Sequence, residues 1–205
     1  MIAKGVSKYQ ALSLLQQYTS LQYCPLSKYG KGEFKGKYFY WEFEVQPTVL
    51  SSTYRVLIVF HSDNYSPDIY ILDKDVWGIS QQKIIPHLYD QKKVKLCLYY
   101  PTYKEWTNKI PLCGTIVQWI YLWLYYYEEW LYSEEWKGGG IHPQVNNSEE
   151  VEERSLTPLE RIRGQKKKKT KSKKNQEKAA AVVNQIFEKR KKVYLESLSS
   201  LGEQE

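Results

Sequence analysis

A change in the spacing of apolar residues constrains the fold of this chain more than any other feature. Along three runs, 34–45, 53–61 and 68–72, aromatic and aliphatic residues alternate with other side chains. This period of two is typical of β-strands, because successive side chains of a strand point to opposite faces of a sheet. The linkers between the runs are short and contain Pro47 and Pro67. We therefore expect a meander of three or four antiparallel strands.

Helical patterns lie on both sides of the expected meander. Residues 8–20 favour a short helix with Leu12 and Leu15 on its apolar face, and residues 21–33 are expected to be a loop. From Leu112 to Trp136 apolar residues recur every three or four positions, and the glycines at 138–140 end the pattern. Residues 73–103 show no clear period and are expected to be irregular. This order of segments predicts an α+β fold.

Charge separates a nearly neutral domain from a basic tail. Residues 161–205 hold 14 Lys and Arg against 5 Asp and Glu, whereas residues 1–160 hold 16 against 18. We expect a folded domain at 1–143, a polar and then lysine-rich linker at 144–175, and an amphipathic helix at 176–205. The lysine run at 166–174 is compatible with a solvated linker, a contact to an acidic protein, or a contact to nucleic acid or an anionic membrane.

Cysteine usage and hydropathy bear on the compartment. The three cysteines, Cys24, Cys97 and Cys113, include no Cys-x-x-Cys pair, which indicates a reducing environment. Together with three histidines they show no zinc-ligand spacing, and the glycine run lacks the Lys-Ser/Thr of a phosphate loop. The chain starts without an apolar signal segment, and its most apolar run is interrupted by polar residues. We expect a cytoplasmic protein with no metal, no cofactor and no membrane insertion.

Cys97 is the candidate for chemistry. It lies in Leu96-Cys97-Leu98, ten positions after His87 and nine before Trp106. One interpretation is a nucleophilic thiol whose pKa is lowered by Lys93 and Lys95. The other is a small buried hydrophobic residue, because free cysteines are commonly buried. Composition and spacing leave both open.

These residues, taken in order, resemble the ubiquitin-conjugating (UBC) family. In that family an N-terminal helix and a four-stranded meander precede a His-Pro-Asn motif, a catalytic cysteine ten residues later, a tryptophan and a crossover helix. The matching segments here are Ser66-Pro67-Asp68, His87-Leu88-Tyr89, Leu96-Cys97-Leu98 and Trp106.

The resemblance is closer to the conjugating-enzyme-like proteins of bacterial type II CBASS anti-phage systems. It covers roughly residues 8–143. The segments that carry it are Leu96-Cys97-Leu98-Tyr99, Glu105-Trp106 and Trp136-Lys137-Gly138-Gly139-Gly140-Ile141-His142-Pro143.

The resemblance implies a UBC-like fold with a long crossover helix and an acyl transferase. The C-terminus of a partner protein would be carried as a thioester on Cys97. The implied partner is a CBASS nucleotidyltransferase (cyclase), contacted through the aromatic helix or the active-site face. A separate activating enzyme and a second copy of the chain are further candidate partners. The alternatives are a catalytically silent regulatory subunit of the cyclase and a nucleic-acid binder that acts through the tail.

Three further residues have candidate roles by this resemblance. Tyr89 stands where the family has the asparagine that supports the oxyanion, so either Tyr89 or another donor takes that role. His87 is expected to be a hydrogen-bonding strut for the active-site loop, with a general base as the alternative. His142 could fold back toward Cys97 or serve only in its loop.

The tryptophans have simpler interpretations. We expect Trp106 to be a core anchor. The stripe formed by Trp119, Trp123, Tyr126 and Trp130 is spaced by four, three and four positions. Such a stripe either packs against the sheet or forms a protein–protein interface.

Overall fold

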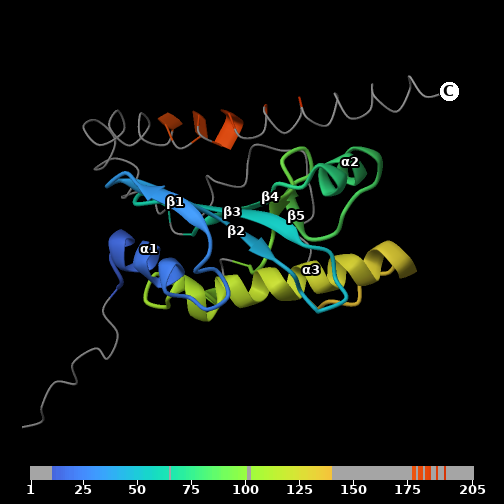
Figure 1. Ribbon diagram of the computed structural model, residues 1–205, viewed down its shortest axis with the longest axis horizontal. Helices are drawn as coiled ribbons and strands as arrows, with labels where there is room; N and C mark the ends of the chain where they lie inside the picture. The colour runs from blue at the N-terminus through green and yellow to red at the C-terminus, as the bar shows by residue number, and fades with distance from the viewer. Residues whose placement is uncertain are drawn as a thin grey trace, which may run out of the picture.

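The computed structural model describes residues 11–64, 66–100 and 103–139, together with 177, 178, 180, 181, 183–185, 188 and 192. It confirms the α+β organisation, with an N-terminal helix, an antiparallel sheet and a long helix (Figure 1). In chain order the elements are α1 (Leu14–Gln22), β1 (Lys31–Phe34), β2 (Tyr38–Val45), β3 (Tyr54–His61), β4 (Asp68–Ile71), α2 (Lys74–Gln82), β5 (Leu88–Asp90), β6 (Lys95–Leu96), a 3-10 turn η2 (Leu112–Gly114) and α3 (Ile116–Ser133).

The sheet has six strands in the order β1-β2-β3-β4-β6-β5, and all of its neighbours are antiparallel. β2, β3 and β4 are the three strands expected from the alternation, and β1 adds a fourth strand to their meander. The prediction of four strands was nevertheless incomplete. The hairpin of β5 and β6 extends the sheet beyond β4, and β6 pairs with it at Tyr70↔Lys95. Strands of three and two residues are too short to show an alternation in the sequence.

β1 lies in a segment that was expected to be a loop. It pairs with β2 from Lys31↔Glu42 to Phe34↔Phe39. A Cβ atom at Gly32 would lie 2.0 Å from the carbonyl oxygen of Tyr40, so the close approach of the two strands requires glycine. Glycine favours a loop prediction, but here Gly32 is the residue that allows β1 to pair with β2.

The helices depart from the expected boundaries for local reasons. α1 begins at Leu14 because Ser13 and Gln16 form a capping box. Its apolar face also differs, since Leu15 is 53% exposed and Gln17 and Leu21 are buried. α3 ends at Ser133, before the glycines, because Glu134 adopts a left-handed conformation (φ 56°) and its N–H bonds to the Trp130 carbonyl.

α2 was not expected, because the whole of 73–103 was predicted to be irregular. It is nine residues long, and only Val76, Gly78 and Ser80 in it are buried. Such a short helix with one apolar buried side chain gives little periodic signal.

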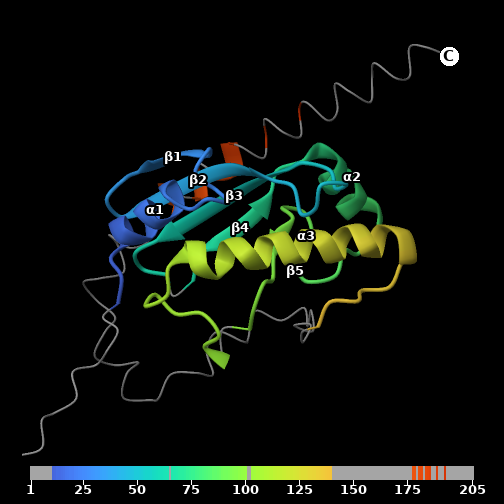
Figure 2. The ribbon, with the colours of Figure 1, turned by 60° about the horizontal axis from the view of Figure 1, so that its bottom comes forward.

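One face of the sheet carries the main core. α1 and α3 cover this face (Figures 1 and 2). The inward residues of β2 and β3 are those predicted from the alternation: Phe39, Trp41, Phe43, Val45, Tyr54, Val56, Ile58 and Phe60. Trp106 is buried among them with its ring edge-on to Phe60, at 5.7 Å between ring centroids, so its role as a core anchor is confirmed.

The opposite face of the sheet is also apolar. Its buried residues are Tyr38, Leu57, Val59, Tyr70 and Leu72. Val183, one of the described C-terminal residues, packs on them and is 4% exposed. Figure 1 shows this segment on the side of the sheet away from α1 and α3. The lysine run at 166–174 lies outside the described residues.

His61 on this second face gives the domain a pH-dependent stability. Burial lowers the pKa of His61 below 6.5, although Asp63 partly opposes the shift. The unfolded chain therefore takes up a proton near pH 6.5 that the folded chain binds only at lower pH. The stabilisation is complete above pH 6.5 and is lost as the pH falls below it. We expect the free energy of unfolding to decrease between pH 7.5 and pH 5.5 in urea titrations.

The variant His61→Asn isolates this contribution. The Nδ1 atom of His61 accepts a hydrogen bond from the Asp63 N–H at 3.1 Å, and an asparagine Oδ1 can take its place. The variant should lose the part of the pH dependence that His61 contributes. If the free energy of unfolding of the variant changes with pH as steeply as that of the wild type, the pH dependence comes from other groups.

Candidate functional site

Cys97 follows β6 directly and is fixed by its backbone. Its N–H donates to the carbonyl oxygen of His87 at 2.9 Å. His87 has φ 54°, a left-handed conformation that is unusual for a residue other than glycine. The same carbonyl accepts a second hydrogen bond, from Nε1 of Trp123 in α3 at 3.2 Å. The His87 main chain therefore joins the cysteine segment to the long helix.

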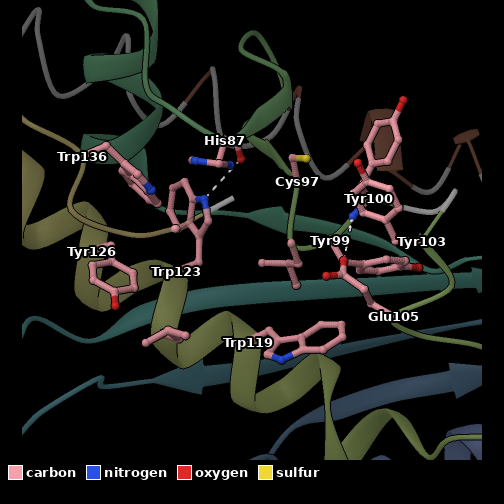
Figure 3. Close-up of a pocket in the computed structure, with 13 residues that line it drawn as sticks. His87, Cys97, Tyr99, Tyr100, Tyr103, Glu105, Trp119, Trp123, Tyr126 and Trp136 are labelled. Carbon is pink, nitrogen blue, oxygen red and sulfur yellow. Dashed lines mark hydrogen bonds between the residues drawn. The ribbon is translucent and has the colours of Figure 1, made fainter. Parts of the chain in front are cut away.

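The side chain of Cys97 is 6% exposed and contributes to the wall of a pocket (Figure 3). The pocket has a volume of about 430 Å³. Its lining consists of His87, Cys97, Leu98, Tyr99, Tyr100, Tyr103, Glu105, Trp119, Leu122, Trp123, Tyr126, Trp136 and Gly139. The buried cysteine is thus next to a space that is large enough for a ligand.

The His87 ring is directed away from the cysteine sulfur. Its centroid lies 5.0 Å from that of Trp136, and in Figure 3 the ring points toward Trp136 whereas the sulfur points toward Tyr100. His87 contacts the Cys97 segment through its carbonyl oxygen. This geometry fits a strut better than a general base.

Tyr89 lies beside the thiol. Its hydroxyl donates to the carbonyl oxygen of Tyr99 at 3.0 Å and is also within hydrogen-bond reach of the Cys97 sulfur. A phenol has one proton, so it can donate to the carbonyl or to a thiolate, but not to both at once.

The pKa of the Cys97 thiol is raised, not lowered. Burial raises it above 9.0, and the hydrogen bond from Tyr89 opposes that shift only in part. The expectation that Lys93 and Lys95 would lower it was wrong. The ammonium of Lys95 is paired with Asp68 at 2.7 Å. The thiol is therefore largely protonated at neutral pH.

The variant Tyr89→Phe tests the hydrogen bond to the sulfur. We expect the pKa of Cys97 to rise further, because the variant loses the one contact that lowers it. Alkylation of Cys97 by iodoacetamide at pH 8 should slow about five- to fifteen-fold, measured by mass spectrometry of the Cys97 peptide. Tyr103→Phe changes another tyrosine of the pocket and is the control. Equal slowing in both variants would show that the Tyr89 hydroxyl does not act on the thiol.

The aromatic stripe of α3 divides between core and pocket. Trp123 and Trp130 are buried, as packing against the sheet requires, while Trp119 and Tyr126 are half-buried and line the pocket. The stripe therefore serves in part as core and in part as pocket wall. The exposed large apolar residues of α3 are different ones, namely Leu122, Tyr125, Leu131 and Tyr132.

Residues shortly after Cys97 form another part of the pocket lining. The carboxylate of Glu105 accepts a hydrogen bond from the Tyr100 N–H at 3.1 Å. The ring of Tyr99 packs on Trp119, with 5.5 Å between centroids. Sequence analysis did not assign these residues to the site. The only signal was that Tyr99 and Glu105 belong to the segments that carried the resemblance.

The remaining expected residues lie elsewhere. His142 is outside the described residues, although Trp136 and Gly139 of the same motif line the pocket. The thiols of Cys24 and Cys113 are in contact with each other, and burial raises the pKa of Cys113 to about 12. Neither of them lines the pocket at Cys97.

Two further properties concern only the described part of the chain. Within it, no three His, Cys, Asp or Glu side chains are grouped so that they could hold a metal ion. No helix there combines the length and apolar character needed to cross a membrane.

The fold and site define an α+β protein with a single cysteine set between a short β-hairpin and an aromatic helix. Comparison with known proteins gives the family. A family model described as a type II CBASS E2 protein matches residues 17–143, more than half of the chain. The chain belongs to this family, which confirms the resemblance and supports a role in CBASS anti-phage defence alongside other CBASS components. A search of curated proteins found no significant match.

Proposed function

We propose that the protein is a conjugating-enzyme-like transferase that carries the C-terminus of a partner protein as a thioester on Cys97. The observation that carries the proposal is the Cys97 thiol in the pocket wall with a hydroxyl donor beside it, in a chain of the CBASS E2 family. The partner would be the CBASS nucleotidyltransferase (cyclase), acting in the bacterial cytoplasm.

Loading of Cys97 requires a donor carboxyl that is already activated. The donor would arrive as an acyl-adenylate or as a thioester of a separate activating enzyme. The Cys97 thiolate attacks the carbonyl carbon, the new C–S bond forms, and AMP or the activating enzyme's thiol leaves with the electron pair of the broken bond. The proton lost by Cys97 goes to solvent or to the leaving thiolate.

The second step transfers the donor to an amine. The amine attacks the thioester carbon through a tetrahedral oxyanion, the C–N bond forms, and the C–S bond breaks to regenerate the Cys97 thiol. The oxyanion needs a hydrogen-bond donor close to the sulfur. Tyr89 is proposed for this role, since its hydroxyl is within reach of the sulfur and can rotate away from the Tyr99 carbonyl.

His87 is proposed as a positioning residue. Its carbonyl oxygen holds both the Cys97 N–H and the Trp123 indole. The sulfur is thereby kept at a fixed place relative to α3. A base at His87 is not needed for transfer between thiols, because a thiolate can attack a thioester directly.

The cyclase is proposed to dock along the outer side of α3, next to the active-site face. Three large apolar residues that share one face of the helix are exposed there: Leu122, Tyr125 and Tyr132. Leu122 also lines the pocket, so this surface is continuous with the site that holds Cys97. A second copy of the chain is the other candidate for this surface.

Mass spectrometry of the protein co-expressed with its cyclase and any activating enzyme tests the proposal. We expect an adduct with the combined mass of the two chains less one water, mapped to Cys97 and released by hydroxylamine or a thiol reductant. If no adduct is found under non-reducing conditions with the activator and ATP present, the transferase function is wrong.

A catalytically silent binding subunit is the second candidate. The low exposure of Cys97 and its raised pKa favour it, because both oppose adventitious reaction of the thiol. In that case the protein would bind the cyclase without forming an adduct. Binding measured by co-purification, together with an unmodified Cys97, would distinguish it from the transferase.

A further inference from the structure

We propose that the pocket beside Cys97 selects the donor by binding an apolar side chain near its C-terminus. The substrate class would be proteins whose chain ends in a small residue with a bulky apolar residue one to three positions before it. This inference rests on the proposed thioester function and adds the feature by which the donor is recognised.

The path to the sulfur determines what occupies the pocket. Cys97 is 6% exposed and lies in the pocket wall, so a chain joined to its sulfur must leave along the pocket. An extended chain rises about 3.3 Å per residue, so the side chains one to three positions before the thioester lie within about 10 Å of the sulfur. The last residues of the donor therefore occupy the pocket while the donor is bound to Cys97 as a thioester.

The small terminal residue follows from burial. Its carbonyl carbon must reach bonding distance of a sulfur that is almost completely enclosed. Leu96, before the cysteine, is buried, and Leu98, after it, is half-buried against the core. Little space is left for a side chain on the residue that forms the thioester.

The pocket lining favours an apolar side chain over an acidic one. Most of its walls are aromatic rings, and α3 contributes Trp119, Leu122, Trp123 and Tyr126 on adjoining turns. Among the described residues that line the pocket, Glu105 is the only one with a carboxylate. Its charge and the negative faces of the rings repel a second carboxylate. Burying a leucine-sized side chain there contributes about 1.5–3 kcal/mol, which corresponds to about 10- to 150-fold in rate or affinity.

Peptide thioesters provide a direct test with the full-length protein. The probes are fluorescent hexapeptides that end in glycine, activated as mercaptoethanesulfonate thioesters, with Leu, Trp, Ser or Asp at the third-last position. In the reaction the Cys97 sulfur bonds to the glycine carbonyl carbon, the bond to mercaptoethanesulfonate breaks, and that thiol leaves with the proton from Cys97. The second-order rate constant for acylation of Cys97 is measured by intact mass spectrometry. We expect the Leu and Trp peptides to react about 10- to 100-fold faster than the Asp peptide.

A matched pair of variants places the selectivity in the pocket. Leu122 lines the pocket and is 50% exposed, whereas Gln118, one turn earlier on the same helix, is exposed and does not line it. Leu122→Lys should slow the Leu peptide and accelerate the Asp peptide, because an ammonium then lies in the pocket. Gln118→Lys adds the same charge outside the pocket and should leave the order of rates unchanged.

The outcomes separate this inference from the function on which it rests. Equal rates for all four peptides, or equal effects of the two lysine variants, would overturn the pocket inference and leave the thioester function in place. If the apolar residue speeds only the later transfer to an amine, the pocket holds the acceptor and the inference is wrong. If no peptide acylates Cys97 while iodoacetamide still modifies it, both the thioester function and the inference fail. If Cys97 reacts more slowly with the peptides as the protein concentration rises, a second copy of the chain fills the pocket. That result would also overturn the pocket inference.

Discussion

Replacing Cys97 with alanine is expected to abolish the adduct with the donor protein, to below about one-thousandth of the wild-type level. No other described cysteine lines the pocket, so no second thiol can take over the attack. Cys97→Ser should give a different result. An oxygen nucleophile would form an ester in small amount, and that ester would resist thiol reductants. Non-reducing gels and intact masses of the co-expressed proteins measure both effects.

Cys113→Ala is the matched control, because it removes another cysteine of the same chain. Its adduct should equal that of the wild type. The Cys97 side chain is buried, so loss of its sulfur is expected to reduce stability by about 1 kcal/mol, which a thermal melt will show. An adduct that persists in Cys97→Ala and disappears in Cys113→Ala would move the thioester to Cys113.

The parts of the fold that could be predicted are those with long, uninterrupted periods. In β2 and β3, eight residues each, alternate side chains are buried against the core, and the alternation of Phe39, Trp41, Phe43 and Val45 marked that face correctly. β1, β5, β6 and α2 were missed. They are too short to show a period, and they are held in place by neighbouring elements instead of by local propensity.

The site was only partly predictable for a related reason. The resemblance to the UBC family implied that Cys97, His87 and Tyr89 lie in one site, and in the structure His87 and Tyr89 both contact Cys97. The pocket itself was not predicted, because its walls come from four separate segments: His87, residues 97–105, α3 and residues 136–139. The sign of the pKa shift was also missed, since the burial that raises it depends on tertiary packing that a count of nearby lysines does not include.

Gln17 is a residue whose importance could not be read from the sequence, and Gln17→Leu is expected to destabilise the domain by about 2–6 kcal/mol. Gln17 is completely buried. Its Nε2 donates to the carbonyl oxygens of Asn108 (3.2 Å) and Ile110 (3.1 Å), and its Oε1 accepts from the N–H of Leu112 (2.9 Å). Leucine has a similar volume but leaves the Ile110 carbonyl and the Leu112 N–H without this partner. The Asn108 carbonyl keeps the hydrogen bond that it accepts from the Leu12 N–H at 2.9 Å. Each unsatisfied buried group costs about 1–3 kcal/mol.

The consequence extends from stability to the site. Through these bonds Gln17 ties α1 to the segment that leads into α3, the helix that forms one wall of the Cys97 pocket. Urea unfolding of Gln17→Leu should therefore show a large fall in the free energy of unfolding, a substantial part of the roughly 5–15 kcal/mol typical of a domain. Gln22→Leu makes the same change at the exposed last residue of α1 and should shift that free energy by less than about 0.5 kcal/mol. If the two variants unfold at the same urea concentration, the buried amide does not hold α1 to the chain before α3, and the stability of that junction must come from apolar packing alone.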